Sequence, residues 1–204
     1  MSRLLLVRHG VTEFNSTRRF GGHSDIELSA DGHEQVERIR DRLTGEKIDA
    51  IYSSDLKRAL VTAEVISTGH DVDIETCPEL REMNYGDIEG LTFEEIGHRY
   101  PELWEMIINF DFRLNFPGGE SWNGFTKRTI TFLDRLNKHA PEETILIVSH
   151  SGPLRVLICN LLGIDQSHWL QIRIDNASLS IVDTYPKRVI LSLLNDTSHL
   201  RKAD

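Results

Sequence analysis

The feature that most constrains the fold of this chain is an apolar run that ends in a cation, an imidazole and a glycine. Residues 4–7 are all apolar and lead directly into Arg8, His9 and Gly10. A short run without polar interruption is typical of a strand buried on both faces of a parallel sheet. In open α/β sheets, ligands bind at the carboxyl ends of the strands. The sequence therefore predicts an arginine and a histidine side by side at a sheet edge, where Gly10 lets the backbone turn tightly or approach a ligand.

A second apolar run, residues 144–148, ends in the same way. It is followed by Ser149, His150, Ser151 and Gly152. Because the carboxyl ends of parallel strands meet at one edge of a sheet, His150 and the first histidine converge if their two strands are neighbours. The remaining chemistry of the chain is then whatever surrounds this pair of imidazoles.

The spacing of apolar residues predicts strands that alternate with helices. Further strands are expected at 50–53, 72–76, 179–183 and 188–194, the last two as a hairpin. Helices are expected over 29–45, 56–66, 94–109 with a break at Pro101, 121–136 and 153–162, and residues 13–19 form a short helix or an ordered loop. This alternation indicates a mainly parallel sheet covered on both faces. We therefore predict an α/β fold, a three-layer α/β/α sandwich with a mainly parallel central sheet, in a single domain over residues 1–204.

The charge balance narrows the choice of partners. The 204 residues carry a formal net charge of −9, which argues against nucleic acid or an anionic membrane as the main partner. No apolar run approaches the length that spans a bilayer, and five apolar residues before Arg8 are too few for a signal peptide. Cys77 and Cys159 are too few for a disulfide framework, so we expect reduced thiols in a cytoplasmic protein.

Two further segments place charged side chains at the same expected sheet edge. Arg58 follows the strand at 50–53 and lies in the first turn of the next helix. Glu82 lies in a loop at 79–86 that is rich in acidic residues. The plainest alternative to a catalytic role for Glu82 is that this loop is simply solvated. Two arginines and two histidines near one edge form a cationic pocket, and helix N-termini there add donors for an anion. A lone carboxylate beside such a pocket can donate a proton.

Together these segments resemble the histidine phosphatase superfamily, specifically its phosphoglycerate mutase-like branch. The resemblance begins at Leu4 and extends almost to the C-terminus. One such motif alone would be weak evidence, but four motifs in the family's order are specific. They are residues 8–12 with Asn15 and the loop 20–25, residues 52–59, residues 80–82 with 85–86, and residues 148–152.

The resemblance implies a role for each matching residue. The implied catalytic residues are His9 as the nucleophile that accepts the phosphoryl group, Arg8, Arg58 and His150 as the groups that hold the phosphate oxygens, and Glu82 as general acid and then general base. The implied substrate-binding residues are Asn15, Gly21, Gly22, Tyr85 and Ser151. Such roles agree with phosphoryl transfer, which needs positioning and charge neutralisation more than covalent activation. A neutral imidazole is already a nucleophile when one tautomer is held.

We expect no metal and no cofactor. The pocket would already hold three cations, Arg8, Arg58 and His150, and the sequence has no metal-ligand spacing such as HExxH or CxxC. The expected ligand is a small phosphorylated substrate. The chain is expected to act either as a monomer or as a homodimer. The role of His23, in the loop that borders the substrate, stays open, and Arg18 and Arg19 are either surface charges or steer phosphate.

The segment 91–116 distinguishes phosphatases from mutases within this family. Mutases that use 2,3-bisphosphoglycerate carry a lysine and paired arginines there, whereas this chain has only Arg99 and Arg113 as cations among aromatic and acidic residues. The segment predicts a partly apolar lid, and residues 116–121 resemble the small phosphatases, including α-ribazole phosphatases and broad-specificity phosphatases.

We therefore predict a metal-independent phosphomonoester hydrolase that acts through a phosphohistidine. Its substrate is expected to be a small metabolite such as α-ribazole 5′-phosphate, phosphoserine or a sugar phosphate. Two alternatives remain: a 2,3-bisphosphoglycerate-dependent phosphoglycerate mutase, and a non-catalytic module that binds a phosphorylated ligand.

Overall fold

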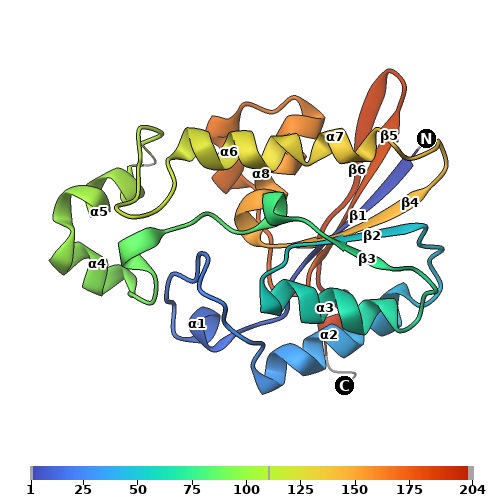
Figure 1. Ribbon diagram of the computed structural model, residues 1–204, viewed down its shortest axis with the longest axis horizontal. Helices are drawn as coiled ribbons and strands as arrows, with labels where there is room; N and C mark the ends of the chain where they lie inside the picture. The colour runs from blue at the N-terminus through green and yellow to red at the C-terminus, as the bar shows by residue number, and fades with distance from the viewer. Residues whose placement is uncertain (1, 110, 202–204) are drawn as a thin grey trace.

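The computed structural model describes residues 2–109 and 111–201 of the chain. Within these residues a six-stranded sheet forms the centre of the molecule, with strand order β3-β2-β4-β1-β5-β6 (Figure 1). The strands are β1 (Ser2–Arg8), β2 (Ala50–Ser53), β3 (Ile74–Thr76), β4 (Thr144–Ser149), β5 (Leu179–Tyr185) and β6 (Arg188–Asp196). Strands β3, β2, β4 and β1 are parallel, whereas β5 runs antiparallel to β1 and forms a hairpin with β6. The predicted α/β fold with a mainly parallel sheet is confirmed.

Strand β1 shows how the sheet creates a functional edge. Residues 4–7 are all buried and point alternately to the two faces, so helices must cover both. Burying each of these side chains is worth roughly 1.5–3 kcal/mol, which fixes the strand at the centre of the sheet. Strand β4 pairs with β1 in a register that places Arg8 opposite Ser149. The next residues, His9 and His150, therefore emerge at the same edge, as the sequence predicted.

Helices complete the three layers (Figure 1). On one face lie α2 (Ala30–Leu43) and α3 (Lys57–Ser67); on the other lie α7 (Leu133–Leu136) and α8 (Ser151–Leu162), with α6 (Trp122–Thr131) packed along α8. The helix predicted over 121–136 is interrupted, because the backbone N–H of Phe132 bonds Thr129 in a tighter turn. Helix α8 begins two residues earlier than expected, at Ser151.

A lid stands beside the sheet at its functional edge. It consists of α4 (Phe93–Arg99) and α5 (Pro101–Ile108), with the expected break at Pro101, and α1 (Glu13–Ser16) lies nearby (Figure 1). A third apolar cluster, which includes Ile96, Phe116 and Phe125, joins the lid to α6 and α8. The lid is thus anchored by its own apolar core rather than by the sheet.

Four short 3₁₀ helices complete the described elements: η1 (Pro78–Leu80), η2 (Gly86–Ile88), η3 (Gln166–Gln171) and η4 (Ser198–Leu200). Glu82 therefore lies in irregular chain between η1 and η2. Over the ranges 2–109 and 111–201, we find no helix that is both long and apolar enough to cross a membrane.

Candidate active site

A cavity of about 340 Å³ opens at the carboxyl ends of β1 and β2. Nine of the ten residues that the sequence assigned to the site line it: Arg8, His9, Asn15, Gly21, Gly22, Arg58, Glu82, Tyr85 and Ser151. The tenth, His150, lies directly behind, with its ring centre 5.0 Å from that of His9. The cavity thus brings together segments that are more than 140 residues apart in the chain. We call it the phosphate pocket.

The imidazole of His9 is held in a single tautomer. Its Nδ1 lies 2.7 Å from the carbonyl oxygen of Gly10, and because a carbonyl only accepts hydrogen bonds, Nδ1 carries the proton. The Nε2 atom therefore has a free lone pair. Burial, with the positive charges of Arg58 and Arg8, holds the pKa of His9 well below its ordinary value of 6.5. The side chain is neutral at physiological pH and nucleophilic at Nε2.

His150 corrects the expectation of a third cation in the pocket. Burial, with the nearby charge of Arg58, holds its pKa well below 6.5, so the ring is neutral. Its Nδ1 accepts a hydrogen bond from Nε of Arg58 at 3.2 Å, and its Nε2 donates to the hydroxyl of Ser54 at 2.8 Å. The sequence could not show this state, because it depends on complete burial beside an arginine.

The two arginines supply the positive charge. Arg8 donates one hydrogen bond to the carbonyl of Ile174 at 2.8 Å, and its buried Nε has no partner among the described residues. Burial lowers the pKa of Arg8 from 12.5 to about 10, which still leaves it protonated at neutral pH. A guanidinium that is buried with unpaired N–H groups is unfavourable unless an anion accepts them.

Arg58 makes more hydrogen bonds within the protein than Arg8 does. It donates to the carbonyls of Ser24 at 2.8 Å and Gly22 at 2.7 Å, and to His150. Three of the five guanidinium N–H groups are used in this way, so two remain for a ligand. Arg58 therefore holds the loop at residues 21–24 against the pocket as well as adding charge to it.

Asn15 presents its amide nitrogen to the pocket because its oxygen is occupied. The Oδ1 atom accepts from the backbone N–H and the hydroxyl of Thr12, and from Nδ2 of Asn176 at 3.1 Å. Asn176 also donates to the carbonyl of His9 at 3.2 Å. Asn176 thus ties Asn15 to the backbone at His9, and sequence patterns gave no signal for it.

The carboxylate of Glu82 lies at the N-terminus of α8. It accepts from the backbone N–H of Met83 at 2.9 Å and of Gly152 at 3.2 Å, and from the hydroxyl of Ser151 at 3.4 Å. The absence of a side chain at Gly152 leaves room for this carboxylate, because a Cβ there would lie 2.2 Å from Oε1 of Glu82 and would displace it. Glu82 is 8 % exposed, which excludes the alternative of a freely solvated acidic loop.

The loop that borders the pocket is held by Glu89. Its carboxylate accepts the backbone N–H groups of His23 at 2.8 Å and Ser24 at 2.7 Å. Gly22 has a positive φ of 47°, and a Cβ there would lie 2.0 Å from Oε1 of Glu89. His23 reaches back from this loop, and its Nε2 donates to the backbone carbonyl of Glu82 at 3.0 Å.

A second, apolar cavity of about 450 Å³ adjoins the phosphate pocket. Phe20, Tyr85 and Phe93 line both cavities and separate them by edge-to-face ring contacts. The apolar cavity is otherwise lined by Met83, Ile107, Ile108, Leu114, Phe116, Trp122, Arg155, Trp169 and Leu170. The expectation of an apolar lid over this edge is consistent with these residues.

The two arginines of segment 91–116, Arg99 and Arg113, do not reach the leaving-group side of the site. Both are exposed and line neither cavity, and Arg113 pairs with Asp111. Instead, Arg18 and Arg19 line the phosphate pocket. Arg155 lines the apolar cavity, donates to the carbonyl of Ile172 at 2.7 Å and lies over the ring of Trp169. These cations come from outside segment 91–116. A position beside the phosphate was one of the two alternatives for Arg18 and Arg19, whereas the sequence pattern gave no signal for Arg155.

The donor set does not suit a metal ion. Among residues 2–109 and 111–201, no group of three or more His, Cys, Asp or Glu side chains is close enough to hold one. The pocket has instead a buried arginine, a partly buried one, an amide nitrogen and a helix N-terminus, all of which suit an anion.

Comparison with known proteins gives the family. The model of the histidine phosphatase superfamily (branch 1) matches residues 4–197. Phosphoserine phosphatase 1 of Hydrogenobacter thermophilus is 34% identical over 200 residues, which cover 98% of this chain and 95% of that protein. The crystal structure of the α-ribazole phosphatase from Shigella flexneri has a TM-score of 0.88 at 32% identity, covering 95% of this chain and 96% of its own.

A further solved structure contains a ligand. It is a phosphoserine phosphatase mutant from Entamoeba histolytica in complex with phosphoserine, with a TM-score of 0.85, 29% identity, and coverage of 98% of this chain and 100% of its own. The chain described here belongs to the histidine phosphatase superfamily, branch 1. The predicted family and enzyme class, a phosphatase, are confirmed.

Proposed function

We propose that this chain hydrolyses phosphate monoesters by transferring the phosphoryl group to Nε2 of His9. The observation that carries the proposal is the fixed tautomer: the bond from Nδ1 to Gly10 leaves Nε2 as the nucleophilic atom in a pocket built for an anion. No separate base is needed, because the ring is already neutral.

The phosphate oxygens are proposed to bind to donors that the protein leaves free. These are the unpaired N–H groups of Arg8, the two remaining N–H groups of Arg58 and the amide nitrogen of Asn15. Charge-assisted hydrogen bonds of this kind neutralise the transferring group and align it with the nucleophile.

Glu82 is proposed to act on the other side of the phosphorus atom. In the first step its carboxylic proton passes to the ester oxygen as the P–O bond breaks and the bond to Nε2 forms, so that a neutral alcohol leaves. In the second step its carboxylate takes a proton from water, which attacks the phosphohistidine. The hydroxyl of Ser151 and the N–H of Gly152 hold the carboxylate for both steps.

His150 is proposed to support the phosphate only after it gains a proton. Its Nδ1 now accepts from Arg58, so it has no hydrogen to offer there. A phosphate dianion beside the ring would favour the imidazolium, and Nδ1 could then donate to a phosphate oxygen.

The substrate is proposed to be a small phosphorylated metabolite, with phosphoserine, α-ribazole 5′-phosphate and a sugar phosphate as candidates. The names of the relatives support the first two. The adjoining apolar cavity, with Arg155 at its wall, favours an alcohol that combines an apolar body with a polar or anionic group. A phosphoglycerate mutase is the second candidate, because Arg18 and Arg19 add positive charge beside the pocket.

The test is a panel of monoesters assayed in excess EDTA. We expect release of inorganic phosphate from at least one of the three candidate substrates, without loss of activity on metal removal and with inhibition by vanadate. The control is product analysis with 3-phosphoglycerate and 2,3-bisphosphoglycerate. Interconversion of phosphoglycerates that is much faster than any phosphate release would make the chain a mutase instead, and activity restored by a divalent ion would contradict a metal-free mechanism.

Location and assembly also stay proposals. We propose a cytoplasmic enzyme, because Cys77 and Cys159 are free and buried, as in a reducing compartment. Burial raises the pKa of Cys77 to about 11, so this thiol is unreactive. A homodimer stays open, and sedimentation at two protein concentrations would distinguish it from a monomer.

A further inference from the structure

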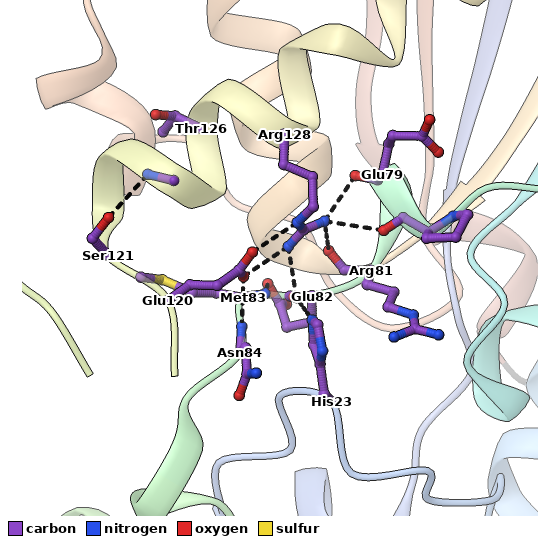
Figure 2. Close-up of polar contacts among 12 residues, drawn as sticks. His23, Glu79, Arg81, Glu82, Met83, Asn84, Glu120, Ser121, Thr126 and Arg128 are labelled. Atoms are coloured by element: carbon purple, nitrogen blue, oxygen red, sulfur yellow. Dashed lines mark hydrogen bonds and ion pairs between the residues drawn. The ribbon is translucent and has the colours of Figure 1, made fainter. Parts of the chain in front are cut away.

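The loop that carries Glu82 wraps around one guanidinium group (Figure 2). Arg128, on α6, donates to the backbone carbonyls of Pro78 at 3.2 Å, Glu79 at 2.9 Å, Arg81 at 3.0 Å and Glu82 at 3.1 Å. It also makes two hydrogen bonds to the carboxylate of Glu120, at 2.8 and 2.9 Å. Two carbonyls of η1 and two of the irregular chain that follows it thus converge on one side chain.

Glu120 extends this contact to the far end of the loop. The same carboxylate accepts the backbone N–H of Asn84 at 2.9 Å. Burial alone would raise the pKa of Glu120, but the bonds from Arg128 and Asn84 outweigh it and lower the pKa below its ordinary value. Glu120 therefore stays ionised and remains the partner of Arg128 at neutral pH.

His23 holds the same loop from the opposite side. Figure 2 shows Arg128 above the chain at Glu82 and His23 below it. The carbonyl oxygen of Glu82 accepts from both, at 3.1 Å from Arg128 and 3.0 Å from Nε2 of His23. With this carbonyl held from two sides and the N–H of Asn84 held by Glu120, the backbone that carries the carboxylate has little freedom.

The ion pair between Arg128 and Glu120 fixes the geometry of the loop more than it adds to the free energy of folding. The side chains of Arg128 and Glu120 are only 20 % and 21 % exposed. Removing two charges from water costs nearly as much as their attraction returns, so an apolar pair of similar size could stabilise the fold as well. An apolar pair could not bond the four carbonyls. Neither side chain lines the phosphate pocket.

We propose that Arg128 and Glu120 are positioning residues that place Glu82 for proton transfer to the leaving alcohol. The proposal rests on the proposed role of Glu82 as general acid. A misplaced carboxylate still leaves Arg8, Arg58 and His9 in position to bind phosphate. Loss of the pair should therefore slow steps that need the proton and leave phosphate affinity unchanged.

The test compares two leaving groups in single-turnover experiments. Phosphoserine has an alkyl leaving group that needs the proton, whereas 4-nitrophenol leaves as a stable anion without it. Arg128→Met and Arg128→Lys should lower alcohol release from phosphoserine by about 100-fold and from 4-nitrophenyl phosphate by less than about fivefold. Lysine keeps the charge but not the planar fork of donors, so it should not rescue the rate. Glu120→Gln should have a smaller effect in the same direction.

Two controls distinguish this proposal from the proposed function. Glu82→Gln should show the same dependence on the leaving group, and if it does not, the role of Glu82 itself is wrong. Arg135, on α7, pairs with the carboxylates of Glu75 and Glu79 but bonds no carbonyl of the loop, and Arg135→Met should leave both rates unchanged.

The inhibition constant of inorganic phosphate reports whether each variant still has a folded pocket. We expect it to change by less than about threefold in the Arg128 variants. Equal losses on both substrates, or a large loss of phosphate affinity, would show that Arg128 only supports the fold and would overturn the proposal.

Discussion

His9 follows a central strand of the sheet, whereas Glu82 lies in irregular chain between η1 and η2. On the side of the proposed nucleophile, the imidazole is held by backbone groups: the register of β1 and β4 sets its position, and the carbonyl of the adjacent Gly10 accepts from its ring. On the acid side, the loop is held by Arg128, 46 residues further along the chain, and by His23, 59 residues earlier. The position of the proposed nucleophile thus depends on backbone pairing within the sheet, while that of the proposed acid depends on side chains from outside its loop.

This difference predicts how substitutions in each half of the pocket will affect activity. Substitutions on the nucleophile side should remove chemistry or alter the charge balance without moving the sheet. Substitutions on the acid side should change geometry and depend on the leaving group. The predictions below test the contrast, from the largest expected effect to the smallest.

His9→Ala should abolish turnover while the fold persists. Loss of a nucleophile in enzymes with covalent intermediates lowers the rate on the order of 10⁵-fold or more. Because residues 4–7 are buried independently of the ring, the melting temperature should change little. The measurement is steady-state turnover with thermal unfolding, and the control is the exposed His168→Ala. Turnover near the wild-type rate would contradict the assignment of the nucleophile.

Gly152→Ala should damage the acid side selectively. The added Cβ would lie 2.2 Å from Oε1 of Glu82, so the carboxylate must move by about an ångström. A displacement of this size is worth about 100-fold in rate, and we expect it for alkyl phosphates. Gly45→Ala is the matched control, since nothing lies within 4 Å of its added Cβ. A variant that loses phosphate affinity instead would show that the acid side also shapes the phosphate pocket.

Arg155→Met should alter substrate choice rather than chemistry. Arg155 faces the apolar cavity, and loss of a charge-assisted hydrogen bond is worth about tenfold or more in affinity. We expect KM for phosphoserine, which carries a carboxylate, to rise about tenfold, while KM for 4-nitrophenyl phosphate stays the same. Arg113→Met, at an exposed arginine that follows α5, should change neither. Parallel changes in KM for both substrates would argue against contact with the alcohol.

The buried histidine should make stability fall in mild acid. The pKa of His9 is held well below 6.5, so below that pH the unfolded chain binds a proton that the folded chain does not. The contribution of neutral His9 to the free energy of unfolding is therefore fully present above about pH 6.5. It is lost as the pH falls toward the folded-state pKa, by up to ~1.4 kcal/mol per pH unit. His9→Asn should make this decline less steep in denaturant titrations between pH 7 and 5. An identical decline in both proteins would mean that His9 is not neutral by burial.

Most of the fold follows from apolar runs and a few residues of special geometry. The runs at 4–7 and 144–148 predicted two strands, and Pro101 predicted the break between α4 and α5, because each signal is contained in adjacent residues. That the two strands are neighbours was a condition that only the structure could supply. The break at Phe132 was missed, because the apolar spacing continues through the tighter turn. The extent of β3 was overestimated by two residues, since an edge strand ends where pairing ends.

The residues of the site also fall into those that the sequence predicted and those that it missed. His9 at a strand end and Arg58 in the first turn of α3 were predicted because the motif and the element that positions them are contiguous. Arg128, Arg155 and Asn176 were missed, because on a helix or loop they resemble ordinary polar residues until the fold brings them to the pocket. The neutral state of His150 was missed for a related reason, since it depends on burial and on a neighbouring charge rather than on residue type.

The most direct test of the account is to identify which nitrogen of His9 carries the phosphoryl group. The enzyme would be quenched with alkali during turnover of a labelled monoester, and the phosphohistidine isomer would be determined by NMR of the isolated peptide. The bond from Nδ1 to Gly10 predicts phosphate on Nε2 of His9 and on no other residue. Phosphate on Nδ1, or a label that persists in His9→Ala, would contradict the central claim that a fixed tautomer directs the nucleophile.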